Sequence, residues 1–142
     1  MSTYNHFIVG LDLSSDSKIV LEKARHLAET TGASLSVCHV IEPLAYAYGG
    51  DIPVNLAEAQ LTMEEHAQAR LKQVLDDFSF SIKHDSIVIG ETSSELRRIA
   101  ADENADLIVV GSHGRHGLAV LLGSTASGVL HGAQCDVLAV RV

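Results

Sequence analysis

The sequence predicts an α/β protein of one domain, built on an open parallel sheet with helices on both faces. Five short apolar segments alternate with four segments whose apolar residues recur every three or four positions. Connections between parallel strands are right-handed crossovers, and they place helices against the two faces of the sheet. The chain has 142 residues, of which 46% are hydrophobic and 20% charged, which suits one globular domain.

The five predicted strands are short runs rich in Val, Ile and Leu, bounded by polar or glycine residues. They are residues 7–12, 33–41, 86–90, 107–110 and 135–142. The first run ends in Asp12, and the fourth is followed directly by a glycine-rich stretch. Between the second and third strands, residues 42–54 contain both prolines of the chain and a Gly-Gly pair, which indicates a loop.

The four predicted helices have apolar residues on one face. The first follows a cluster of N-cap residues at 14–17 and ends at Gly32, which suits a left-handed C-cap. The second is long, the third opens at residues 92–94, and the fourth begins near Ser124. Their apolar positions are Val20, Ala24, Leu27 and Ala28; Ala67, Leu71, Val74, Leu75 and Phe78; Leu96, Ile99 and Ala100; and Ala126, Val129 and Leu130.

Charge and composition exclude several classes of partner. The net charge of −8 and the lack of a Lys/Arg stripe argue against nucleic acid. No apolar run approaches the length of about 18 residues that a membrane span needs, and we identify no signal peptide. We therefore expect a cytoplasmic protein without membrane contact, in which Cys38 and Cys135 are reduced, buried thiols.

The glycine-rich stretch 111–128 is the main candidate for a ligand site. In open α/β sheets, ligands bind beyond the carboxyl ends of the strands, where the strand order reverses. Glycine allows backbone N–H groups to approach a phosphate, and a helix that begins at Ser124 would add unpaired N–H donors and hydroxyl groups. The stretch matches neither a Walker A motif nor a dinucleotide fingerprint. A glycine-rich turn without a ligand is the alternative interpretation.

Enzyme chemistry receives little support from the sequence. There is no G-x-S-x-G elbow and no clear set of nucleophile, base and orienting residue. Ser112 and His113 are adjacent in sequence, which does not supply the geometry of a catalytic triad. The eight histidines are scattered, and His39 has no partner at metal-ligand spacing, so no resident metal is predicted.

Several motifs together resemble the universal stress protein family, and the resemblance covers essentially the whole chain. They are FIVGLD at 7–12, HV at 39–40, DLIVVGSHGR at 106–115, GS at 123–124 and CDVLAV at 135–140. The resemblance implies a Rossmann-like, five-stranded parallel sheet with strand order 3-2-1-4-5. It also implies a homodimer formed through the last strand, with Val137, Leu138, Ala139, Val140 and Val142 at the interface. An apolar edge strand of this kind is usually covered by a partner.

Some members of the family bind ATP through the pattern G-x2-G-x9-G-[S/T], so the resemblance implies a site for ATP or AMP. A divalent metal would then enter only together with the nucleotide. By resemblance, Asp12 and Val40 would meet the adenine, and Gly10 and Gly111 the ribose. The residues implied around the phosphates are His113, Gly114, Gly123, Ser124 and Thr125.

Two departures keep other functions open. Only eight residues separate Gly114 from Gly123, which shortens the chain between them by up to about 3.3–3.6 Å. Residues 12–14, 21–24 and 54–56 resemble the branch of the family that does not bind ATP. Besides a stress-response binding module for adenine nucleotides, we consider a dimeric scaffold that acts on an unknown regulatory protein. A weak ATPase is the third alternative. Asp12 is interpreted either as a ligand acceptor or as a cap for the first helix.

Overall fold

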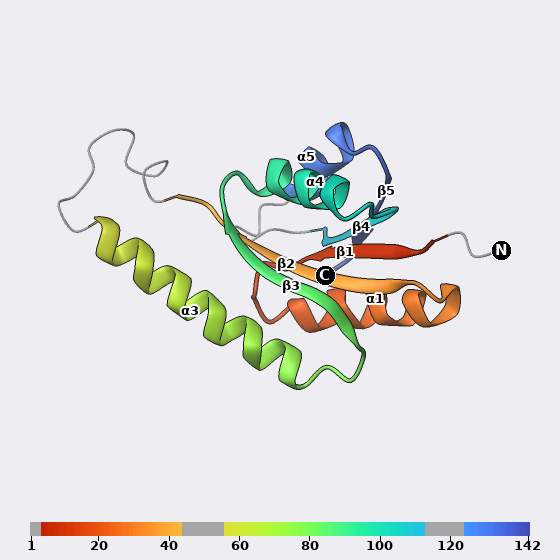
Figure 1. Ribbon diagram of the computed structural model, residues 1–142, viewed down its shortest axis with the longest axis horizontal. Helices are drawn as coiled ribbons and strands as arrows, with labels where there is room; N and C mark the ends of the chain where they lie inside the picture. The colour runs from red at the N-terminus through yellow and green to blue at the C-terminus, as the bar shows by residue number, and fades with distance from the viewer. Residues whose placement is uncertain (1–3, 44–55, 113–123) are drawn as a thin grey trace.

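A computed structural model describes residues 4–43, 56–112 and 124–142. Its centre is a five-stranded parallel sheet of order β3-β2-β1-β4-β5, which confirms the predicted order (Figure 1). The chain lays down β2 and β3 on one side of β1, and then β4 and β5 on the other. The strands are β1 (His6–Gly10), β2 (Ser34–Ile41), β3 (Ile82–Ile89), β4 (Leu107–Gly111) and β5 (Asp136–Val140).

Helices cover both faces of this sheet. The described helices are α1 (Ser17–Thr31), α3 (Leu56–Asp76), α4 (Thr92–Asp102) and α5 (Ser124–Gly132). Helices α1 and α3 lie on one face, and α4 and α5 lie on the other (Figure 1). Figure 1 also shows that the amino-terminal half of α3 extends past the end of the sheet.

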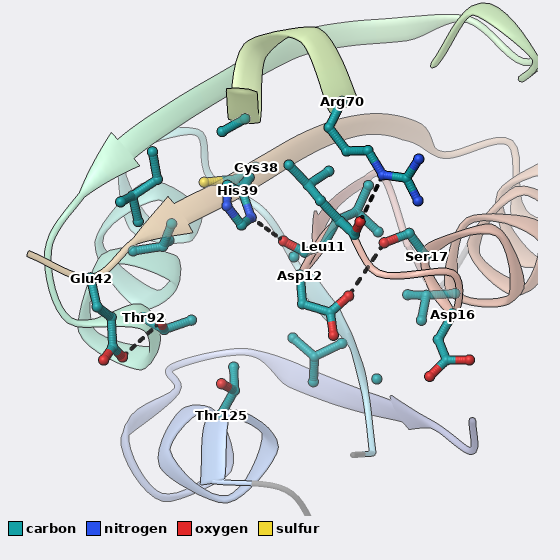
Figure 2. Close-up of a pocket in the computed structure, with 18 of the residues that line it drawn as sticks. Leu11, Asp12, Asp16, Ser17, Cys38, His39, Glu42, Arg70, Thr92 and Thr125 are labelled. Atoms are coloured by element: carbon teal, nitrogen blue, oxygen red, sulfur yellow. Dashed lines mark hydrogen bonds between the residues drawn. The ribbon is translucent and has the colours of Figure 1, made fainter. Parts of the chain in front are cut away.

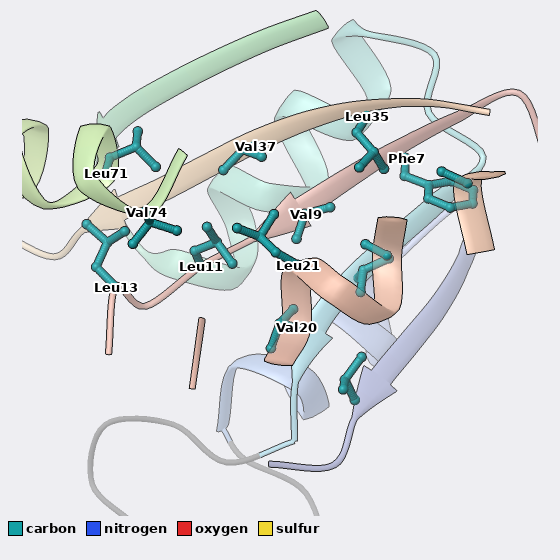
Figure 3. Packing of buried hydrophobic residues seen from close by; sticks show 14 of the residues in the cluster. Phe7, Val9, Leu11, Leu13, Val20, Leu21, Leu35, Val37, Leu71 and Val74 are labelled. Atoms are coloured by element: carbon teal, nitrogen blue, oxygen red, sulfur yellow. The ribbon is translucent and has the colours of Figure 1, made fainter. Parts of the chain in front are cut away.

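The core has two parts because the side chains of a strand alternate between the faces of a sheet. Phe7 and Val9 of β1 face α1 and α3, whereas Ile8 between them packs with the α4 and α5 residues. Figure 3 shows the first part, in which Val20 and Leu21 of α1 pack under β1 and β2. Strands buried on both faces explain why the sequence reads as continuous apolar runs.

Several element boundaries differ from the sequence predictions; β1, for example, ends at Gly10 rather than at Asp12. Strand β3 begins at Ile82, earlier than the predicted Ser86. The prediction missed its first half because that half is mostly polar and exposed on an edge strand. Helix α3 begins at Leu56, well before its predicted apolar face. The prediction missed the first half of the helix because the buried residues are confined to the later half. Strand β5 (Asp136–Val140) is shorter than the predicted 135–142, and the charged residue Arg141 follows it directly.

The helix caps agree with the sequence in part. Gly32 ends α1 in the predicted left-handed conformation, with φ of 78°. At the start of α1, Asp16 occupies the N-cap position but makes no capping hydrogen bond with its side chain. Helix α4 is capped by Glu91, whose carboxylate accepts from the backbone N–H of Ser94. The hydrogen bond from the Ser93 hydroxyl, followed by that from the Ser94 N–H, lowers the pKa of Glu91.

A buried polar cluster ties the amino-terminal edge of the sheet to the end of α4. The His6 ring places Nδ1 2.7 Å from the Ser34 hydroxyl and Nε2 3.1 Å from Oε1 of Glu103. The Ser36 hydroxyl donates to the same carboxylate oxygen at 2.8 Å. Burial acts to raise the pKa of Glu103, but the hydrogen bonds from Ser36 and His6, with nearby His84, outweigh it and lower that pKa.

Candidate ligand-binding cleft

A cleft of about 700 Å³ opens at the carboxyl ends of β1, β2 and β4 (Figure 2). It lies where the strand order reverses between β1 and β4, which is the place where open α/β sheets bind their ligands. Its walls come from the loop after β1, the ends of β2 and β4, the start of α1 and one face of α3. A volume of this size is typical of a small-molecule site.

Five of the sequence-predicted residues meet in this cleft. Gly10, Asp12, Val40, Gly111 and Thr125 all line it, although they come from three different strands, the loop after β1 and one helix. The sixth described residue of the set, Ser124, is the first residue of α5. The remaining three predicted positions, His113, Gly114 and Gly123, lie outside the described residues.

Asp12 organises the loop between β1 and α1. Its Oδ1 accepts from the backbone N–H of Ser14 at 2.9 Å and from the hydroxyl of Ser14 at 2.7 Å. The hydroxyl of Ser17, the first residue of α1, lies 3.4 Å from the same oxygen. One oxygen of the Asp12 carboxylate is thus engaged by the loop and by the first residue of α1, while the N-cap position itself belongs to Asp16.

Gly10 has a packing reason to be glycine. A Cβ built at this position would lie 2.8 Å from Cδ1 of Leu96 and 3.3 Å from Cγ1 of Val110. Leu96 is buried in the second part of the core, so it has little room to yield. The missing side chain lets α4 approach β1 closely.

Two buried residues of β2, Cys38 and His39, line the cleft. The Nδ1 atom of His39 lies 2.7 Å from the Leu11 carbonyl oxygen, and because a carbonyl only accepts, Nδ1 carries the proton. This bond joins β2 to the loop after β1. Burial raises the pKa of the Cys38 thiol to about 11, so this cleft cysteine is protonated at neutral pH and is a poor nucleophile.

One wall of the cleft was missed by sequence reasoning. Thr62, His66 and Arg70 of α3 line the cleft at intervals of four residues, together with Met63. The four-residue interval places them on one face of the helix. The interval is visible in the sequence, but exposed polar residues on an amphipathic helix are normally solvated, so nothing marked them as part of a site.

The opposite wall depends on the packing of α5 against α4. A Cβ built at Gly128 would lie 2.7 Å from Oγ and 2.8 Å from Cβ of Ser93. The absence of a side chain therefore sets how closely the two helices approach, and with it the position of Thr125 in the cleft. At the start of α4, the hydroxyl of Thr92 donates to the carboxylate of Glu42 at 3.0 Å, and both residues line the cleft.

Four of the five residues predicted for a dimer interface lie on β5, which has β4 as its only neighbour among the described strands. Val137, Leu138 and Ala139 are partly buried, whereas the side chain of Val140 is buried in the core of its own chain and Val142 lines the cleft. A partner would therefore meet the backbone of β5 and the first three of these side chains.

None of the described helices is both long and apolar enough to cross a lipid bilayer. Within the same residues, no three His, Cys, Asp or Glu side chains gather in a way that could hold a metal ion.

Comparison with known proteins gives a consistent result. Residues 3–141 match the model of the universal stress protein family. The chain is 40% identical to universal stress protein A homolog 1 of Coxiella burnetii over 139 residues, which is 96% of each chain. It is 38% identical to homolog 2 of the same organism, covering 100% of this chain and 98% of that protein.

Solved structures show the same similarity. Universal stress protein UspA from Lactobacillus plantarum superposes with a TM-score of 0.82 at 25% identity, covering 99% of this chain and 100% of the other. A universal stress protein in complex with cAMP superposes with a TM-score of 0.64 at 25% identity, covering 99% and 98%. The family model that matches residues 3–141 and the identity of 40% over 96% of each chain show that this chain belongs to the universal stress protein family.

Proposed function

We propose that the cleft binds an adenine nucleotide, with the base toward the loop after β1 and the phosphates toward the start of α5. The observation that carries this proposal is the convergence of Gly10, Asp12, Val40, Gly111 and Thr125 on one cleft of nucleotide size. The first turn of α5 offers N–H groups without intrahelical partners, and such groups favour an anion. A related protein of known structure holds cAMP, which supports the same ligand class.

The proposal predicts that ATP and AMP bind with micromolar affinity in isothermal titration calorimetry. Thr125→Val removes one hydroxyl from the phosphate end and is expected to weaken ATP binding at least about tenfold, the usual cost of losing a hydrogen bond to a charged group. Gly114→Val tests the predicted phosphate loop from the sequence side. Adenosine, which has no phosphate, should be affected much less by either change.

Thr30→Val is the matched control. Thr30 is exposed on α1, and its hydroxyl donates to the carbonyl of His26 in the same helix, so ATP affinity should not change. If the unaltered protein gives no heat with millimolar ATP, AMP or adenosine, the proposal is wrong. The scaffold function, which acts through protein contacts, is then the better account.

We also propose that two chains pair through β5. Leu138→Arg adds a long charged side chain at this edge and is expected to lower the mass measured by light scattering from twice 15.1 kDa to 15.1 kDa. Ile89→Arg, at the end of the other edge strand, is the control because Ile89 is similarly apolar and 42% exposed. A dimer that survives Leu138→Arg, or that Ile89→Arg also disrupts, contradicts pairing through β5.

A further inference from the structure

Arg70 is anchored to the loop that forms one end of the cleft. Its Nε donates to the carbonyl oxygen of Leu13 at 3.1 Å (Figure 2). Leu13 has a left-handed backbone, with φ of 62°, and a side chain only 7% exposed. Arg70 is exposed, but the hydrogen bond to the backbone of buried Leu13 holds its guanidinium group beside the loop.

The other two nitrogens of this guanidinium group have no protein partner in the described part of the chain. Asp12, Asp16 and Glu42 line the same cleft, yet no ion pair joins any of them to Arg70. Arg70 is also the only Lys or Arg among the described lining residues. A planar, permanently charged group therefore lies at the edge of the cleft, with two nitrogens that no described residue engages.

The position of Arg70 determines which part of a ligand it would meet. Arg70 belongs to α3, on one face of the sheet, whereas Thr125 belongs to α5, on the other. Figure 2 shows the two on opposite sides of the cleft, with Asp12 between them. A nucleotide whose phosphates lie at the start of α5 therefore directs its base toward Arg70.

We propose that Arg70 binds the base of the nucleotide, with its guanidinium plane against the aromatic ring. This inference rests on the proposed function. A guanidinium over an aromatic face gains both stacking and cation–π attraction. Such a contact uses the planar shape of Arg, so lysine at the same position does not replace it.

The test measures adenosine and ATP binding to Arg70→Ala and Arg70→Lys by calorimetry. Each substitution is expected to weaken the binding of adenosine and the binding of ATP by the same factor, roughly 3- to 30-fold. Lys72→Ala is the matched control, since it removes one positive charge from the exposed face of the same helix, outside the cleft, where Lys72 pairs with Asp76 at 3.8 Å. It should leave both affinities unchanged, and circular dichroism should show that every variant is folded at the temperature of the titration.

Each alternative result overturns the inference in a recognisable way. If Arg70→Ala weakens ATP but not adenosine, Arg70 contacts a phosphate. If Arg70→Lys retains full affinity, charge alone suffices and the planar contact is wrong. If both substitutions leave adenosine and ATP binding unaffected, Arg70 is outside the site. If the unaltered protein binds neither ligand, the proposed function has failed, and that result is visible without any variant.

Discussion

Glu103→Ala is expected to lower the free energy of unfolding by about 2–3 kcal/mol at pH 7 in urea titrations. The substitution leaves the His6 ring and the Ser36 hydroxyl without the carboxylate that they contact at 3.1 and 2.8 Å. His6 is only 6% exposed, so water replaces that acceptor poorly. The loss should therefore be far larger than for an exposed ion pair.

The neighbouring residue supplies the control for this prediction. Asp102 is an exposed carboxylate that pairs with Arg98 at 3.1 Å, and Asp102→Ala should cost at most about 1 kcal/mol. Equal losses for the two substitutions would contradict a special role for the buried cluster. Glu103→Gln keeps an acceptor but no charge, and an intermediate loss is expected.

The Glu103 effect also has a predicted dependence on pH. Folding lowers the pKa of Glu103 from its ordinary value of 4.5, so the folded state favours the ionised form. The stabilisation is complete above pH 4.5 and is lost as the pH falls through the lower folded-state pKa. The difference between the unaltered protein and Glu103→Ala should therefore shrink in urea titrations below pH 4, and a difference that grows there would contradict the assignment.

Gly128→Val is expected to destabilise the protein by about 1–3 kcal/mol, the usual cost of overpacking a core. The added side chain would meet both Oγ and Cβ of Ser93, which is 7% exposed and cannot move into solvent. Helix α5 must then move away from α4 and carry Thr125 with it. We expect weaker ATP binding in calorimetry as well as a lower free energy of unfolding in urea.

Gly132→Val is the control for this substitution. Gly132 is the last residue of the same helix, and a Cβ there would meet the side chain of Arg97, which is flexible and can move aside. Little change is expected in stability or in ATP affinity. Adding Ser93→Gly to Gly128→Val removes the two clashing atoms and should restore part of the loss, because residues in contact are energetically coupled. No restoration would show that the contact with Ser93 is not the cause.

The sequence predicts the fold well because each central strand is apolar on both sides and each connection has a recognisable helix. It predicts edge features less well. Lys83, His84 and Asp85 of β3 are exposed polar residues, so the apolar signal of that strand begins only after them. Along the first half of α3, no buried apolar face exists to reveal the helix.

Reasoning from the strands alone predicts the cleft residues that lie in or just after a strand, whereas Thr125 of α5 was implied by the family resemblance. Gly10, Asp12 and Gly111 lie in or just after strands, and the carboxyl ends of parallel strands share one edge of the sheet. Arg70 reaches the same cleft only because α3 crosses back beside the loop after β1. The contact between His6 and Glu103 joins positions 97 residues apart, and no local pattern in a single sequence announces such a pair.

The carboxyl-terminal segment belongs both to the edge of the sheet, through β5, and to the lining of the cleft, through Val142. The Ser112 N–H donates to the carbonyl of Val140 at 2.7 Å, and the backbone N–H of Val142 lies 3.4 Å from the Ser112 hydroxyl. Val142 lines the cleft, and the strand just before it is the open edge. Ligand occupancy and subunit pairing would thus act on one continuous segment. Thermodynamic reciprocity then requires that any factor by which nucleotide tightens or loosens pairing is also the factor by which pairing changes nucleotide affinity.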